Sequence, residues 1–279
     1  MCRGSSRSNL VLMVQPILLP PRPQRPPVER AFSFGPIVCA VDDSRGALEA
    51  AAQASRLAGP KDTLTFVSIA RASDDGRAAR AVESARAAAH ADGVEAATEV
   101  LDAQDVSAAI LDFARGAGLL VVSARGRSRS TGALMGSTIA KVVRGARGPL
   151  LVARSVPELG FPAVVLAAAR GLEDRRAIVV AATVAGRCGT RVVLGNVGRS
   201  SSAVRDALPA QAAVVLAITG KDPVTVSVHG PPVDRLPAMA SSVGAGLLVL
   251  GGDGRRDVGV LTTVSEQVAH RAACSVLVL

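Results

Sequence analysis

Aromatic residues are nearly absent from this chain of 279 residues, which has five Phe, no Tyr and no Trp. Their scarcity argues against the aromatic stacking surfaces with which many proteins bind single-stranded nucleic acid. It also argues against the Trp and Tyr belts of membrane proteins. No window contains the run of about 18 apolar residues that a transmembrane helix needs. We therefore expect neither nucleic acid nor a membrane as a partner.

Cysteine and histidine are scarce as well. The four Cys form no C-x-x-C pair and the three His lie far apart, so we expect neither a disulfide framework nor a metal site. Cys39 and Cys274 lie inside apolar runs and are predicted to be core residues with free thiols. Reduced core thiols are typical of cytoplasmic proteins, and we predict that location.

Lysine is limited to three positions, so Arg supplies most of the 32 basic residues and of the net charge of +9. Residues 1–35 carry +4 of this charge, and the longer remainder is close to balanced. The body of the protein therefore lacks the basic stripe that binds a phosphodiester backbone. The run PPRPQRPP within residues 1–35 favours extended, solvated backbone, and we predict a disordered leader there.

The rest of the chain repeats itself. Three strings recur in the same order: PIVCAV (36–41) as PAVVLA (162–167), GAGLLV (116–121) as GAGLLV (244–249), and GPLLV (148–152) as CSVLV (274–278). The matches predict two copies of one domain, residues 36–157 and 158–279. The offset is 126 for the first and last strings and 128 for the middle one. We therefore expect Ala168 to correspond to Asp42, and the second copy to be two residues shorter after GAGLLV.

Each copy alternates short apolar runs with helical patterns. In the first copy we expect strands at 37–41, 63–69, 94–101, 118–123 and 149–154, and helices at 44–58, 75–92, 104–116 and 136–147. Ser44, Asp74 and Ser137 are candidate N-caps. The alternation predicts an α/β fold of two tandem parallel-sheet domains with helices on both faces. We take each sheet to be doubly wound with strand order 3-2-1-4-5, in which strands 1 and 4 are neighbours. Residues 198–223 give no clear pattern, because Pro209 interrupts the helix expected there.

Two elements of the first copy suit a nucleotide. A Gly-, Ser- and Arg-rich loop ends at Gly136-Ser137 where a helix starts, and a helix N-terminus offers N–H groups to a phosphate. Gly126 and Gly136 let an anion approach the backbone, and Arg127 adds positive charge. Asp42 follows the first strand, and the loops after strands 1 and 4 diverge to leave a crevice. An Asp after a strand is also a common helix cap, so a structural role stays open.

This combination resembles the universal stress protein family, and the tandem arrangement resembles its two-domain members. The family's ATP-binding pattern G-x2-G-x9-G-(S/T) is matched with Ser123 in place of the first Gly. The resemblance covers residues 36–279 and implies a flavodoxin-like fold, similar to adenine nucleotide alpha hydrolases, that binds ATP with or without Mg²⁺. The candidate nucleotide-binding residues are then Asp42, Ile69, Ser123, Gly126, Arg127, Gly136, Ser137 and Thr138.

The second copy departs from this pattern. Gly251 and Gly254 retain G-x2-G, but the last pair of the pattern falls on Val264-Ser265 or on Thr262-Thr263, without a Gly. We predict no nucleotide binding there, and hence one site per chain. The fifth strands of the two copies would be apolar sheet edges, so we expect them to pair within the chain as an intrachain pseudo-dimer. A further homodimer stays open.

Two functions remain in competition. One is an ATP-binding, nucleotide-sensing module of a stress response, and the other is a nucleotide-free interaction module that uses the tandem fold as a scaffold. The sequence shows no nucleophile, base or metal cluster and no Walker A loop, so we expect no enzyme beyond slow ATP hydrolysis. A phosphate-accepting receiver domain would need a Lys at the end of strand 5, where this chain has Arg154.

Overall fold

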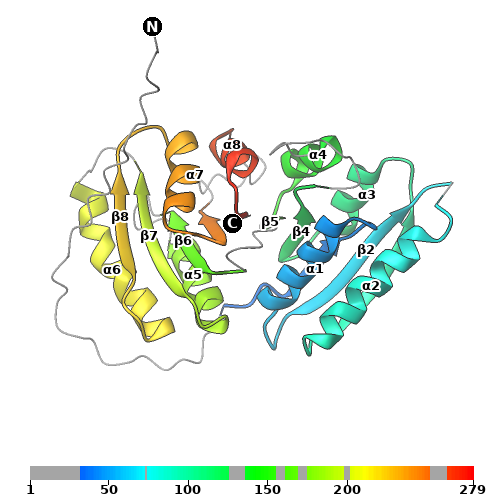
Figure 1. The fold of residues 1–279 in the computed structure, drawn as a ribbon, viewed down its shortest axis with the longest axis horizontal. Coiled ribbons are helices and arrows are strands. Elements are labelled where there is room, and N and C mark those ends of the chain that lie inside the picture. The colour runs from blue at the N-terminus through cyan, green and yellow to red at the C-terminus, as the bar shows by residue number, and fades with distance from the viewer. Residues whose placement is uncertain are drawn as a thin grey trace, which may run out of the picture.

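One ten-stranded sheet runs through the protein (Figure 1). The computed structural model describes residues 32–72, 74–125, 136–154, 161–168, 175–197, 202–251 and 263–279. The strand order is β3-β2-β1-β4-β5-β10-β9-β6-β7-β8, and β5 and β10 pair antiparallel at the centre. Each half therefore has the predicted order 3-2-1-4-5, and the predicted pairing of the two fifth strands joins the halves.

The first domain contains every strand and helix predicted for it. Its elements are β1 (Pro36–Ala40), α1 (Arg45–Leu57), β2 (Thr63–Ala70), α2 (Arg77–Ala91), β3 (Ala96–Asp102), α3 (Val106–Phe113), β4 (Leu119–Ser123), α4 (Ser137–Gly145) and β5 (Leu150–Ala153). Ser44 caps α1 as predicted, and its hydroxyl accepts a hydrogen bond from the Ala47 N–H (3.2 Å). The N-cap of α2 is Gly76 rather than Asp74, although the Asp74 carboxylate accepts from the Ala78 N–H (2.8 Å) in the first turn.

The second domain repeats this arrangement. Its elements are β6 (Val164–Ala168), α5 (Arg175–Arg187), β7 (Arg191–Val197), α6 (Ser202–Thr219), β8 (Val224–Val228), α7 (Pro232–Ser242), β9 (Leu247–Leu250), α8 (Thr263–Arg271) and β10 (Ser275–Val278). The helix that the sequence left uncertain continues through Pro209. Leu208, Ala212 and Val215 of this helix are buried in the core, and this packing outweighs the hydrogen bond lost at the proline.

Two apolar layers cover the two faces of the sheet. Buried side chains of α1, α2, α5 and α6 form one layer, and those of α3, α4, α7 and α8 form the other. Each layer is continuous across both domains, so the domains share one core. Cys39 and Cys274 are buried with free thiols, as predicted. Burial raises the pKa of Cys39 and raises that of Cys274 to about 11.

The register of the sheet corrects the equivalence of the two copies. Ile37 pairs with Leu119, and Val165 pairs with Leu247. Because Leu119 and Leu247 hold the same place in GAGLLV, Ile37 corresponds to Val165, an offset of 128. The predicted offset of 126 for the first strand is therefore wrong, since it rested on two prolines that are not equivalent.

This correction changes which residue of the second domain corresponds to Asp42, and the fifth strands settle which one corresponds to Gly136. Counting from β6, the counterpart of Asp42 is Arg170, not Ala168. The fifth strands keep the offset of 126, because Val121 pairs with Leu151 and Val249 pairs with Leu277 in the same manner. The helices before them also begin 126 residues apart, and Thr262 therefore corresponds to Gly136.

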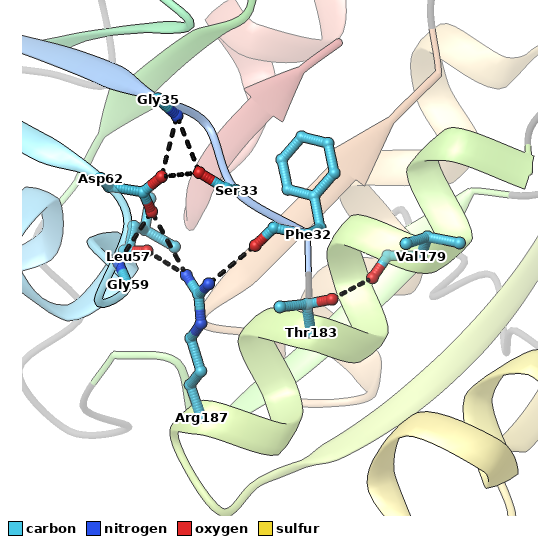
Figure 2. Close-up of polar contacts among 9 residues, drawn as sticks. All are labelled: Phe32, Ser33, Gly35, Leu57, Gly59, Asp62, Val179, Thr183 and Arg187. Carbon is cyan, nitrogen blue, oxygen red and sulfur yellow. Dashed lines mark hydrogen bonds and ion pairs between the residues drawn. The ribbon is translucent and has the colours of Figure 1, made fainter. Parts of the chain in front are cut away.

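Arg187, at the end of α5, reaches across to the first domain (Figure 2). Its guanidinium donates hydrogen bonds to the carbonyl oxygens of Leu57 (2.7 Å) and Phe32 (2.7 Å). It also lies 3.7 Å from the carboxylate of Asp62, whose side chain is fully buried. A Cβ on Gly59 would overlap this guanidinium, so this glycine makes room for the interdomain contact.

A second polar junction is buried beside β5 and β10. The Gln53 side-chain amide donates to the Arg154 carbonyl (2.9 Å), and the Ser275 hydroxyl donates to the Gln53 side-chain oxygen (2.7 Å). The Arg154 guanidinium donates to the Ala269 carbonyl (2.6 Å) near the end of α8, where a cation is favoured by the helix dipole. Burial lowers the pKa of Arg154. Arg154 thus joins the domains, in the place where a receiver domain would have its Lys.

The first domain begins earlier than the predicted boundary at residue 36. Phe34 is buried, and its ring meets that of Phe32 edge-on with centroids 4.9 Å apart. The Arg176 guanidinium of α5 lies 5.8 Å from the centroid of Phe32. Residues 32–35 therefore belong to the fold, and the rest of the predicted disordered leader lies outside the described residues.

Candidate functional site

A cavity of about 250 Å³ opens at the carboxyl ends of β1, β2 and β4, beside the helices α3 and α4. Strands β1 and β4 are neighbours in the sheet, while the chain leaves them for α1 and α4 on opposite faces. Such a divergence leaves a crevice where open α/β sheets bind ligands. The predicted crevice is therefore present in the first domain.

Six of the eight predicted site residues line this cavity: Asp42, Ile69, Ser123, Gly136, Ser137 and Thr138. The remaining two, Gly126 and Arg127, lie outside the described residues. The fold thus brings the acidic turn after β1 and both ends of the glycine loop to one cavity.

Asp42 lies half-buried at the end of β1. Its Oδ1 accepts a hydrogen bond from the Ser44 N–H (3.0 Å), so the carboxylate also shapes the turn into α1. Because Ser44 in turn caps α1, the first turn of this helix fixes the position of the carboxylate at the cavity.

The N-terminus of α4 forms another part of the cavity wall. The N-cap is Gly136, and the prediction of Ser137 as N-cap is wrong by one residue. Gly136 has no side chain to cap the helix, so the first turn of α4 keeps N–H donors and a partial positive charge at the cavity. Its φ of −61° does not require glycine. A Cβ there would meet no atom within 4 Å, so this glycine preserves open space.

Ser123 replaces the first glycine of the family pattern without backbone strain. Among the described residues other than glycine, only Asp75 has a positive φ, so Ser123 does not occupy a left-handed conformation. Its buried hydroxyl donates to the Arg125 carbonyl (2.8 Å) and accepts from the Arg125 N–H (3.3 Å). The serine therefore closes a turn directly after β4.

Sequence reasoning missed the apolar wall that α3 contributes. Val106 and Ile110 lie one turn apart on this helix and both line the cavity, as does Ile139 of α4. The helix itself was predicted, but both of its faces contain apolar residues, and periodicity alone does not indicate which face meets the end of the sheet. Two polar lining residues, Ser68 and Arg71, also went unpredicted.

Asp105 fixes the start of this α3 wall. Its carboxylate accepts hydrogen bonds from the Ser107 hydroxyl (2.6 Å) and from the Ala108 N–H (3.1 Å). These bonds favour the charged form and lower the pKa of Asp105. The N-cap thereby sets where Val106 and Ile110 enter the cavity.

The cavity is lined by both apolar and polar groups. It combines apolar walls with a carboxylate and an uncapped helix N-terminus. Within the described part of the chain, no three His, Cys, Asp or Glu side chains are grouped so that they could hold a metal ion. In that same part, no helix has the length and apolar character needed to cross a membrane.

Solved structures share this fold over most of the chain. A universal stress protein from Archaeoglobus fulgidus DSM 4304 is similar over 88% of this chain and 96% of its own, with a TM-score of 0.65 and 17% identity. A functionally unknown protein from Pseudomonas aeruginosa PAO1 is similar over 88% and 92%, with a TM-score of 0.66 and 18% identity. A universal stress protein in complex with cAMP matches 42% of this chain and 94% of its own, with a TM-score of 0.38 and 25% identity. No curated protein matches the chain.

The sequence model of one family matches the chain twice, over residues 33–154 and 162–279. The two matched segments correspond to the two halves of the sheet, each with the strand order 3-2-1-4-5. The chain therefore belongs to the universal stress protein family and consists of two such domains in tandem.

Proposed function

We propose that the cavity of the first domain binds ATP, and that the protein is a nucleotide-sensing module with one site per chain. The observation that carries this proposal is that Asp42 and the N-terminus of α4 line the same cavity. A helix N-terminus favours phosphate, and a carboxylate accepts hydrogen bonds from sugar hydroxyls. Apolar walls beside these two groups suit a purine base.

Each part of the nucleotide has a proposed place. The base would lie against Ile69 and the α3 wall of Val106 and Ile110, with Asp42 at the ribose. The phosphates would lie at Gly136, Ser137 and Thr138, where the backbone N–H groups of the first turn of α4 are available. Gly126 and Arg127, from the loop between β4 and α4, would complete the phosphate site, and Mg²⁺ would accompany the phosphates.

The cavity would enclose only part of a nucleotide. Its volume of about 250 Å³ lies just below the roughly 300–1,000 Å³ that is typical of small-molecule pockets. The open space at Gly136 lies beside the point where the chain enters α4, so phosphates can extend beyond the cavity. A macromolecular partner would need a broader surface than this.

Three features of the second domain support a single site. By residue correspondence, Arg170 is the counterpart of Asp42 and Thr262 is the counterpart of Gly136, so the carboxylate and the glycine are both replaced. In addition, the fully buried Met239 of α7 packs beside Gly195 of β7, the counterpart of Val67. A base site of the same kind would need this space.

A nucleotide-free interaction module is the second candidate, favoured by the departure from the family pattern at Ser123. Calorimetric titration of the full chain with ATP and Mg²⁺ separates the two. ATP binding at one equivalent per chain, together with a raised thermal midpoint, supports the nucleotide site. Asp42→Ala should then weaken binding, and Asp112→Ala, which removes an exposed carboxylate of α3, should not. No heat of binding in the parent protein would favour the scaffold function.

A further inference from the structure

Helix α1 touches the turn after β4 through a glycine. Gly46 is the second residue of α1. A Cβ built on it would lie 2.5 Å from the Ser123 Oγ and 2.6 Å from the carbonyl oxygen of Arg125. Both separations are well inside van der Waals contact, and one of the two atoms belongs to the backbone. An alanine at this position therefore requires the turn to move.

This turn is hydrogen-bonded to the start of α4. The Ser123 hydroxyl bonds both the N–H and the carbonyl of Arg125, which holds residues 123–125 in a closed turn. Between them, the Ala124 carbonyl accepts a hydrogen bond from the Gly136 N–H (3.4 Å). A displacement of the turn is thus transmitted to the N-cap of α4.

The same end of α1 also holds the acidic turn. The Ser44 N–H donates to Asp42, and the Ser44 hydroxyl caps the helix two residues before Gly46. The first turn of α1 therefore contacts the two walls of the cavity that carry its polar groups. Its packing distance from the β4 turn sets how far the carboxylate lies from the α4 N-terminus.

We propose that Gly46 is a positioning residue of the nucleotide site and acts as a pair with Ser123. The absent Cβ of Gly46 makes room for the hydroxyl of Ser123, which stands where the family pattern has glycine. The pair sets the position of the turn 123–125, and this turn positions Gly136 through the hydrogen bond from the Gly136 N–H to the Ala124 carbonyl. Its effect on ligand affinity rests on the proposed function, but its effect on the turn does not.

The first test compares Gly46→Ala with Gly186→Ala. Gly186 lies within α5, the corresponding helix of the second domain, and a Cβ there would come no closer than 3.8 Å to the Ile218 carbonyl oxygen. Both substitutions raise helix propensity by the same amount. The two variants therefore differ in the clash, which only Gly46→Ala introduces. We expect Gly46→Ala to weaken ATP binding on the order of 10-fold or more, because small displacements in a binding site are costly. Gly186→Ala should bind as the parent does.

The second test is rescue, with a readout that needs no nucleotide. In the double variant Gly46→Ala/Ser123→Gly the closest clashing atom is removed while the contact with the Arg125 carbonyl oxygen remains, so ATP affinity should return in part. Amide exchange of the Gly136 N–H should be faster in Gly46→Ala than in the parent, and its rate in the double variant should lie between the two. If the parent binds no ATP, the proposed function fails, and the exchange rates still decide the role of Gly46.

Three results would overturn the proposal. The first is unchanged affinity and unchanged Gly136 exchange in Gly46→Ala, and the second is an equal loss of affinity in Gly186→Ala. If Gly46→Ala does not fold, the double variant is measured in its place. A double variant that also fails to fold is the third contrary result, because the pair would then not compensate.

Discussion

The two domains share one strand order but use the space at the carboxyl ends of their strands differently. In the first domain, Val67 and Ile69 of β2 line a cavity of about 250 Å³. In the second, Gly195 replaces Val67, and a Cβ on it would lie 2.7 Å from the sulfur of the buried Met239. The shared strand order therefore does not by itself leave this space open, since the Met239 side chain lies beside β7 in the second domain.

The residues at the two polar positions of the cavity also differ between the domains. The first domain has a carboxylate at Asp42 and an uncapped, glycine-started helix at Gly136. The second domain has Arg170 and Thr262 at these two positions. In the second domain, a side chain at Thr262 would therefore hinder a ligand anion from approaching the helix. With Arg170 in place of Asp42, a sugar hydroxyl would find no carboxylate to accept its hydrogen bond. We infer that the second domain serves as a partner in folding, through the shared sheet and core.

The largest expected effect separates the two domains by ligand binding. Gly136→Val should weaken ATP binding by ~100-fold, because the new side chain would occupy space that the phosphates need, while its Cβ would meet no protein atom within 4 Å. Thr262→Val, at the counterpart in the second domain, should leave affinity unchanged. Calorimetric titration of both variants measures this, and similar losses in the two would break the proposed asymmetry.

A substitution in the core tests the difference in packing. Met239→Ala should lower the free energy of unfolding by about 2–5 kcal/mol, because it leaves a cavity over Gly195. Leu111→Ala, the counterpart on α3, should cost less, since Leu111 is only partly buried. Urea denaturation gives both values. A larger loss at Leu111 would show that the second domain is not the more tightly packed one.

The junction between the domains should contribute a smaller amount. Arg187→Ala removes two hydrogen bonds from a charged donor and the cation beside the buried Asp62, and should cost about 2 kcal/mol of unfolding free energy. Arg86→Ala, which breaks an exposed pair with Glu83, should cost far less than Arg187→Ala, because solvent screens an exposed ion pair. We expect a single unfolding transition in urea for the parent protein, because both core layers cross the junction. Two separated transitions would show that the domains unfold independently.

Between pH 7.5 and 10, a single buried thiol should have a smaller effect than Arg187, and each domain contains one such thiol. Burial raises the pKa of Cys274 from 9.0 to about 11, so the neutral thiol stabilises the fold fully below pH 9. That stability is lost as the pH rises from 9 to 11, at about 1.4 kcal/mol per pH unit for one thiol. Cys39 in the first domain acts in the same direction. Cys39→Ala and Cys274→Ala should each reduce the alkaline loss seen in urea denaturation at pH 7.5 and 10, and a loss unaffected by either would be contrary.

Much of the fold could be predicted from the sequence because alternating apolar runs and helical patterns indicate strands and helices of a parallel-sheet α/β fold. The equivalence of the two copies could not, since short apolar strings match at several offsets and only the register showed that Arg170 corresponds to Asp42. The helix through Pro209 was missed because its packing on the sheet is a tertiary effect. The leader and the cytoplasmic location stay predictions.

The site was predicted in part for a similar reason. Local patterns identified Asp42 and Gly136, because each directly follows or starts a predicted element. The apolar wall of Val106 and Ile110 depends on how α3 rotates against the sheet, and the spacing of apolar residues does not fix that rotation. The contact between Gly46 and Ser123 joins segments far apart in the chain, and no local pattern reports it.

Native mass spectrometry of the gently purified full chain, titrated with ATP and Mg²⁺, counts the nucleotides that each chain binds. If the first domain holds the single site, one adenine nucleotide is expected per chain, which disappears in Gly136→Val and persists in Thr262→Val. Two nucleotides per chain, none at all, or one that persists in Gly136→Val would show that the chain has no such single site at the start of α4.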